Sequence, residues 1–166
     1  MATKIVDSKL IAVGERIVRT VRYSREDIAA FAALSLDENP LHIDTQVAQR
    51  ARFGEIIASG QQTSATLMGL LATYFSRNDD GVAREMLCLN MNFAFKGPVF
   101  ADQDVQLSWQ VANVEWKERL GGLLAQLDGH ASVRGGRPSV VARGTILVTE
   151  PRETLARVAP GNPPPP

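Results

Sequence analysis

The feature that most restricts the fold is a change of hydrophobic periodicity near the middle of the chain. Residues 63–77 carry apolar side chains on nearly every face of a helix, which is typical of a buried helix. After turn residues at 78–81, apolar and polar residues alternate with a period of two, as in β-strands. The segments with strand character are 87–95, 105–111, 123–133 and 139–149. We therefore expect four successive strands with short turns, forming an antiparallel meander.

The first part of the chain adds one strand and more helix. Residues 15–23 are rich in β-branched residues and alternate enough to form a strand. Ser24 has the character of an N-cap, with Asp27 at capping-box spacing, and predicts a helix to about Ser35. A short helix is expected from Thr45 to about residue 51. Ser59, three residues before Gln62, predicts the N-terminus of the long helix.

These elements predict a single α+β domain, in which an antiparallel sheet wraps around one long central helix. We place this domain at residues 15–150, after an N-terminal arm of residues 1–14. Residues 151–166 are rich in proline and are expected to form a disordered tail. One sheet leaves a face or an edge without a partner, so we expect a homodimer.

Composition excludes several classes of protein. Eighteen basic residues balance eighteen acidic ones, which argues against a nucleic-acid platform or a polybasic membrane surface. The single cysteine, Cys88, cannot form a disulfide framework within the chain. We find no signal-peptide pattern and no apolar run of membrane-spanning length, so we expect a cytoplasmic protein.

The eight residues from Asp37 to Asp44 hold three acids and one of only two histidines. Pro40 fixes its own φ and disfavours helical backbone at Asn39, so we expect a bent, extended loop. Such a loop could direct Asp37 and His42 at one water molecule. An Asp-x-Asn-Pro sequence is also a common turn signal, and alone it is more often a solvated turn.

Three motifs occur in order along the chain. They are Asp37-Glu38-Asn39-Pro40-Leu41-His42-Ile43-Asp44, then Phe53-Gly54 with Ile57-Ala58-Ser59-Gly60, then residues 93–104. Together they resemble the MaoC-like dehydratases and (R)-specific enoyl-CoA hydratases over about residues 15–150. The resemblance implies a hot-dog fold, a homodimer and an acyl-CoA thioester substrate, with no cofactor. The implied reaction is reversible hydration of a trans-2-enoyl thioester to the (R)-3-hydroxyacyl thioester.

The resemblance also implies roles for single residues. Asp37 would hold and activate water, and His42 would share that water and pass on its proton. Gly60, following Ser59 at the helix N-terminus, would donate its N–H to the thioester oxygen. Gly60 can also be read as an ordinary first helical residue beside a good cap. Asn39 is expected to brace the loop.

Other residues receive less weight. Asp44 is expected to cap the helix that follows it. We expect no metal, because only His42, Asp37 and Asp44 cluster, and His130 lies far away in a predicted strand.

Many family members have His-Gly where this chain has Ser59-Gly60. Arg52, Arg84 and Lys96 are candidates for contacts with coenzyme A phosphates, and no spacing selects among them.

Two alternatives stay open at this stage. A hot-dog thioesterase would share the fold, but its water is usually handled by a carboxylate on the central helix. No acid occurs between Gly60 and Arg77. A non-catalytic subunit that binds acyl thioesters is the other alternative, and the Asp37/His42 pair argues against it. Acyl chain length and the choice between coenzyme A and acyl carrier protein are not encoded in these motifs.

Overall fold

The computed structural model describes residues 9–151, so residues 1–8 and 152–166 lie outside it. The predicted proline-rich tail falls almost entirely in the second of these segments. Of the predicted N-terminal arm, Leu10 and Ile11 are described, and both are buried in the core. The division of the chain at residues 15 and 150 stays a prediction.

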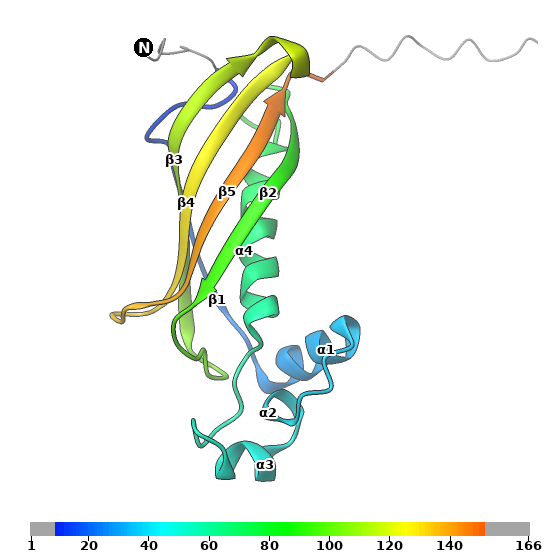
Figure 1. Cartoon of the computed structure of the whole chain (residues 1–166), viewed down its shortest axis with the longest axis vertical. Coiled ribbons are helices and arrows are strands. Elements are labelled where there is room, and N and C mark those ends of the chain that lie inside the picture. Colours follow the sequence, from blue (N-terminus) through cyan, green and yellow to red (C-terminus); the bar gives the residue numbers. More distant parts are fainter. Residues whose placement is uncertain (1–8, 152–166) are drawn as a thin grey trace, which may run out of the picture.

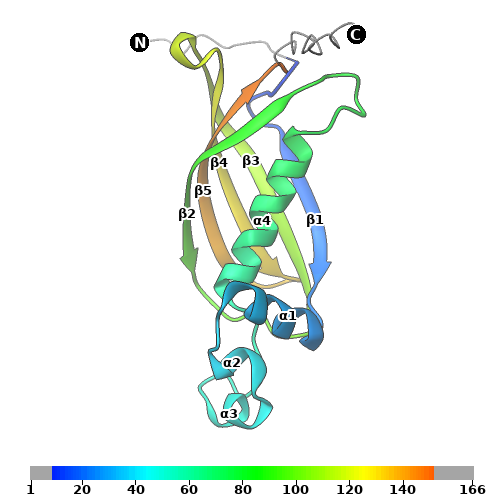
Figure 2. The ribbon, with the colours of Figure 1, turned by 90° about the vertical axis from the view of Figure 1, so that its right-hand side faces the viewer.

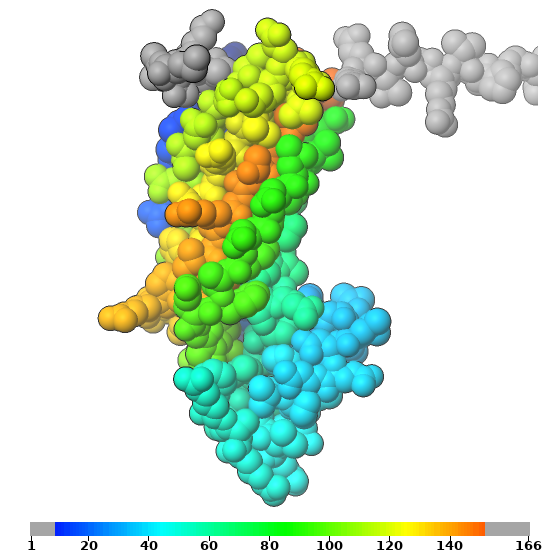
Figure 3. Space-filling view, in the orientation of Figure 1, coloured from blue at the N-terminus to red at the C-terminus, as the bar shows by residue number. Residues whose placement is uncertain are grey.

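A five-stranded antiparallel sheet curves around one long helix, α4 (Figures 1 and 2). The strands are β1 (Arg16–Arg22), β2 (Glu85–Phe95), β3 (Asp104–Lys117), β4 (Gly122–Val133) and β5 (Pro138–Thr149). The helices are α1 (Arg25–Ser35), α2 (Pro40–Ile43), α3 (Thr45–Arg50), α4 (Gly60–Phe75) and the 3₁₀ turn η1 (Glu118–Leu120). The first three helices form a lobe at one end of the sheet (Figure 3). The predicted α+β hot-dog architecture is confirmed.

The order of the strands is β1-β3-β4-β5-β2, which corrects the predicted four-strand meander. Only β3, β4 and β5 follow one another as a meander, while β2 pairs with β5 at the far edge. Strand β1 lies beside β3, and every residue of β1 pairs with a residue of β3. The connection between β2 and β3 therefore crosses the end of the sheet, where Phe100 forms a bridge with Ile57.

Strand β2 does not keep the strict alternation that its sequence suggests. Its register against β5 shifts between Cys88 and Asn90, so Leu89 is an extra residue in a β-bulge. A bulge exchanges the faces of the residues that precede it. Met91 and Phe93 pack against the core, whereas Leu87 and Leu89 remain 61% and 50% exposed. The prediction of one continuous apolar face from Leu87 to Phe95 is wrong for this reason.

Helix α4 buries one face rather than its whole circumference, which corrects a second prediction. Leu67, Leu71 and Phe75 are fully buried against the sheet, while Ala65 and Gly69 are exposed on the other side. Trp109 of β3 donates its indole N–H to the Leu67 carbonyl at 2.9 Å and fixes the helix to the sheet. Among the described residues, no helix has the length and apolar character needed to span a membrane.

Candidate active site

The C-terminus of α1 places Asp37. Leu36 closes the helix in the left-handed region, with φ 59°, and the Asp37 N–H donates to the Ala32 carbonyl at 2.9 Å. At the other end of α1, Ser24 and Asp27 form the predicted capping box. Asp37 Oδ1 accepts a 3.2 Å hydrogen bond from the Asn39 N–H, so the carboxylate is held close to its own backbone.

Residues 40–43 form one helical turn, α2, where an extended loop was predicted. Asn39 has the extended backbone that was predicted from the following proline. An extended backbone is also the conformation of an N-cap residue, so it allows a helix to begin at Pro40. Pro40 then occupies the first helical position, where its missing N–H costs nothing. Asn39 Oδ1 accepts from the Leu41 N–H at 3.1 Å, and its role in bracing the loop stays a prediction. Asp44 caps α3 through the Gln46 and Val47 N–H groups, as predicted.

His42 lies on α2, where a hydrogen bond holds one ring nitrogen and the other faces Asp37. Its Nδ1 is 2.7 Å from the Ile57 carbonyl oxygen, and its Nε2 is 3.6 Å from Asp37 Oδ2. The two side chains are only 8% and 18% exposed. A carbonyl oxygen can only accept, so Nδ1 carries the proton and donates it to Ile57. In the neutral ring, Nε2 therefore presents a lone pair toward Asp37.

Two acceptors that face each other across 3.6 Å suit a water molecule. A carboxylate oxygen and an unprotonated imidazole nitrogen repel as neighbours, but one water can donate a hydrogen to each. The same two groups can then take protons from that water or return them. The geometry thus offers a place where one water could meet two proton acceptors.

The N-terminus of α4 forms the opposite wall. Ser59 Oγ accepts from the Gln62 N–H at 3.1 Å, so the predicted cap is present. The Gln62 amide does not complete a capping box, because it donates to the Asp27 carbonyl of α1 instead. Within residues 9–151 no hydrogen bond uses the N–H of Gly60. That N–H lies at the positive end of the helix dipole.

These residues line one pocket of about 530 Å³. Asp37, His42, Ser59 and Gly60 all contribute to it, so the structure brings together every predicted site residue except Asn39, which supports from outside. Phe53 and Phe95 add apolar wall. The roles assigned to these residues stay predictions.

The ring of Phe95 leaves no room for a larger residue at position 60. A Cβ on Gly60 would lie 2.5 Å from the Phe95 ring. We expect Gly60→Ala to destabilise the wild-type protein, and to be neutral or stabilising in a Phe95→Ala background. Alanine is the better helix former once the contact is gone, by less than the about 1 kcal/mol of a helix interior because residue 60 is the first of α4. Urea unfolding of the four proteins measures the coupling, expected at roughly 1 kcal/mol. An equal effect in both backgrounds would contradict this contact.

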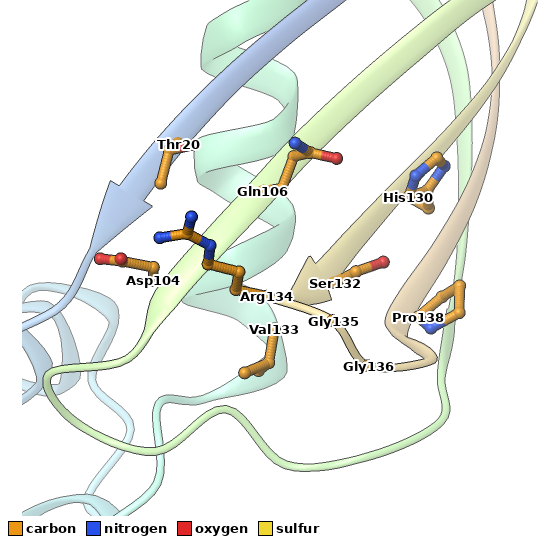
Figure 4. A pocket seen from close by; sticks show the side chains of 10 residues that line it. All are labelled: Thr20, Asp104, Gln106, His130, Ser132, Val133, Arg134, Gly135, Gly136 and Pro138. Atoms are coloured by element: carbon orange, nitrogen blue, oxygen red, sulfur yellow. The ribbon is translucent and has the colours of Figure 1, made fainter.

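The second histidine, His130, lies on the outer face of the sheet. It shares a hollow of about 660 Å³ with Thr20, Gln106 and Ser132 from neighbouring strands (Figure 4). Its chain neighbour Ala131 faces the core on the opposite side. His130 is thus a sheet-surface residue in β4 and does not join His42. In residues 9–151, no three His, Cys, Asp or Glu side chains gather as a metal site would require.

Sequence reasoning missed two parts of the site. The Ile57 carbonyl, which fixes the ring of His42, belongs to the backbone of a matched motif, but its sequence carries no sign of this role. Phe95 belongs to a segment of alternating apolar residues that marks it only as part of a strand, whereas it is 59% exposed and lines the pocket. The approach of Phe95 to Gly60 joins the end of β2 to the start of α4, and no local sequence pattern indicates it.

The profile of the family described as MaoC like domain matches residues 9–122. The chain belongs to the MaoC-like dehydratase family. The (R)-specific enoyl-CoA hydratase of Aeromonas caviae is 29% identical over 141 residues, covering 85% of this chain and 98% of the relative. A mitochondrial 3-hydroxyacyl-[acyl-carrier-protein] dehydratase of Arabidopsis thaliana is 25% identical, covering 62% of this chain and 57% of that protein.

A solved structure agrees with these relatives. The (R)-hydratase from A. caviae, described as involved in PHA biosynthesis, superposes with a TM-score of 0.72 at 27% identity. The match covers 87% of this chain and all of that chain. The two relatives are named as a hydratase and a dehydratase, and this MaoC-like chain shares the fold of the solved hydratase.

Proposed function

We propose that this MaoC-like protein is a hydro-lyase that reversibly adds water to trans-2-enoyl-CoA to give (R)-3-hydroxyacyl-CoA. The observation that carries the proposal is the arrangement of His42 between the Ile57 carbonyl and Asp37. It leaves two proton acceptors, and no donor, facing the space where water would lie. That is the arrangement required to activate water as a nucleophile.

In the proposed reaction, the water oxygen bonds to C3 of the enoyl thioester. The water proton passes through the Asp37/His42 pair to C2, while electron density from the double bond moves transiently onto the thioester oxygen. Delivering the hydroxyl and the proton from one water places both on the same face of the double bond. The product is then the syn adduct.

The developing charge on the thioester oxygen needs a donor. Gly60 supplies the best candidate, because its N–H is unpaired among the described residues and lies at the N-terminus of α4. A backbone donor that is already in place stabilises such a charge without reorganisation. Ser59 contributes by capping the helix and so keeps this donor in position.

Hydration of crotonyl-CoA by the purified protein tests the proposal. We expect loss of the enoyl absorbance without release of free thiol, and chiral analysis should find the (R)-3-hydroxy product. Release of thiol would favour the thioesterase alternative. Binding without either reaction, also with longer and branched enoyl thioesters, would favour the non-catalytic subunit. The (S) product would refute the proposed arrangement of water and substrate.

We also propose that the chain acts as a homodimer in the cytoplasm. Strand β2 is an edge strand of the sheet, and its residues Leu87 and Leu89 are 61% and 50% exposed. The outward face of α4 adds exposed small residues at Ala65, Gly69 and Ala72. An open edge with apolar side chains is a surface that proteins normally cover. Analytical ultracentrifugation would test the dimer.

A further inference from the structure

Two cations stand at the rim of the candidate pocket, on separate segments. Arg52 lies on the connection between α3 and α4, and Lys96 follows directly after β2. Both are exposed, whereas the Asp37 and His42 side chains lining the same pocket are mostly buried. The pocket thus has its acid–base pair in the interior and positive charge at the opening.

Neither cation is neutralised within residues 9–151. No carboxylate lies within 4.0 Å of the Arg52 guanidinium or the Lys96 ammonium, although six other arginines and lysines have such partners. The acid closest to Arg52 in sequence, Glu55, pairs instead with Arg25 at 3.6 Å. Positive charge at the rim is therefore available to an anion.

The backbone beneath Lys96 is well anchored, and Arg52 has a neighbour that orients it. The N–H groups of Lys96 and Gly97 both donate to the Ser139 carbonyl, at 2.8 and 3.3 Å. The guanidinium of Arg52 lies over the Phe53 ring, 5.7 Å from its centroid. Both side chains therefore project from fixed positions at the rim.

Arg84, the third basic candidate from the sequence, is excluded. It follows α4 at the end opposite Gly60, and its side chain is 5% exposed. It donates to Asp80 at 2.9 Å and to the Lys9 carbonyl at 3.3 Å. Its charge is used to hold the chain together at that end of the helix.

We propose that Arg52 and Lys96 bind the phosphate that ends the pantetheine arm of the acyl carrier. This inference rests on the proposed function, because a thioester carbon placed beside Asp37 and His42 directs the arm outward through the rim. An arginine can bind a phosphate with two parallel hydrogen bonds, and a lysine adds a point charge. Coenzyme A and acyl carrier protein share this phosphate, so the pair recognises the carrier rather than the acyl chain.

The test compares the double variant Arg52→Gln/Lys96→Gln with wild type on two crotonyl thioesters. One is the 4′-phosphopantetheine ester, and the other is the N-acetylcysteamine ester, which has no phosphate. We expect KM for the phosphate-bearing ester to rise roughly 10- to 100-fold, with kcat nearly unchanged. The phosphate-free ester should react equally well with both proteins. The wild-type advantage should shrink with added salt, since the contacts are exposed.

The matched control is Arg119→Gln/Arg137→Gln, which removes the same charge from exposed arginines that do not line the pocket. It should behave as wild type. An equal loss on both esters, or no loss on either, would overturn the proposal. Comparing crotonyl-CoA with the ester of acyl carrier protein then identifies the carrier.

Direct binding of coenzyme A separates this proposal from the proposed function. If wild type hydrates none of these esters, the proposed function fails. Calorimetric titration with coenzyme A alone should still show weaker binding by Arg52→Gln/Lys96→Gln than by the control. Equal affinity of the two variants would overturn the assignment of Arg52 and Lys96 by itself.

Discussion

Replacing Asp37 with Asn is expected to lower kcat for hydration of crotonyl-CoA by about 10²–10⁴-fold. The amide keeps the size of the side chain and its oxygen can still accept from the Asn39 N–H. It offers the water an NH₂ donor or a weakly basic oxygen in place of a carboxylate, so the water loses a proton acceptor. The structure of α2 should be unchanged, and circular dichroism would check this.

His42→Ala should cause a loss of similar size, because it removes the second acceptor and frees the Ile57 carbonyl. Asp44→Asn is the matched control. Asp44 lies two residues after His42, but its carboxylate caps α3, and asparagine is an equally good N-cap. Near wild-type activity of Asp37→Asn, or an equal loss in Asp44→Asn, would refute the proposed mechanism.

The parts that were predictable from sequence are those with a local chemical cause. Ser24, Asp44 and Ser59 each cap the helix that was predicted to follow them, because an N-cap is satisfied within three residues. The ends of α1 followed from the same reasoning. The approach of Asp37 to His42 was predicted from the motif and is observed, although their catalytic roles stay a proposal.

The parts that were not predictable depend on distant residues. Pro40 permits both a loop and the first turn of a helix, and the Ile57 hydrogen bond to His42 is a contact across fifteen residues. The alternation in β2 cannot reveal the bulge at Leu89, because apolar residues occupy both its faces. The pairing of β2 with β5 also depends on a distant element, because β1 occupies the edge at β3 and leaves the edge at β5 for β2.

Trp109 and Gly129 provide the largest expected effect on stability. Trp109 is fully buried, donates to the Leu67 carbonyl, and lies against Gly129 of β4, where a Cβ would be 2.4 Å from its ring. We expect Trp109→Ala to lower the free energy of unfolding by about 3–5 kcal/mol, because it leaves a cavity between helix and sheet. Gly129→Ala should cost roughly 1–3 kcal/mol by overpacking the same place.

The double variant distinguishes this contact from two unrelated losses. If the indole ring is what leaves no room at residue 129, the methyl group of Gly129→Ala fits into the space that Trp109→Ala opens. The double variant should then be more stable than the sum of the single effects predicts, by about 1–3 kcal/mol. Urea unfolding at one fixed protein concentration measures this, since dimerisation would make stability depend on concentration. If the effects of the two single substitutions on the free energy of unfolding simply add, the Trp109 ring is not the reason why residue 129 is a glycine.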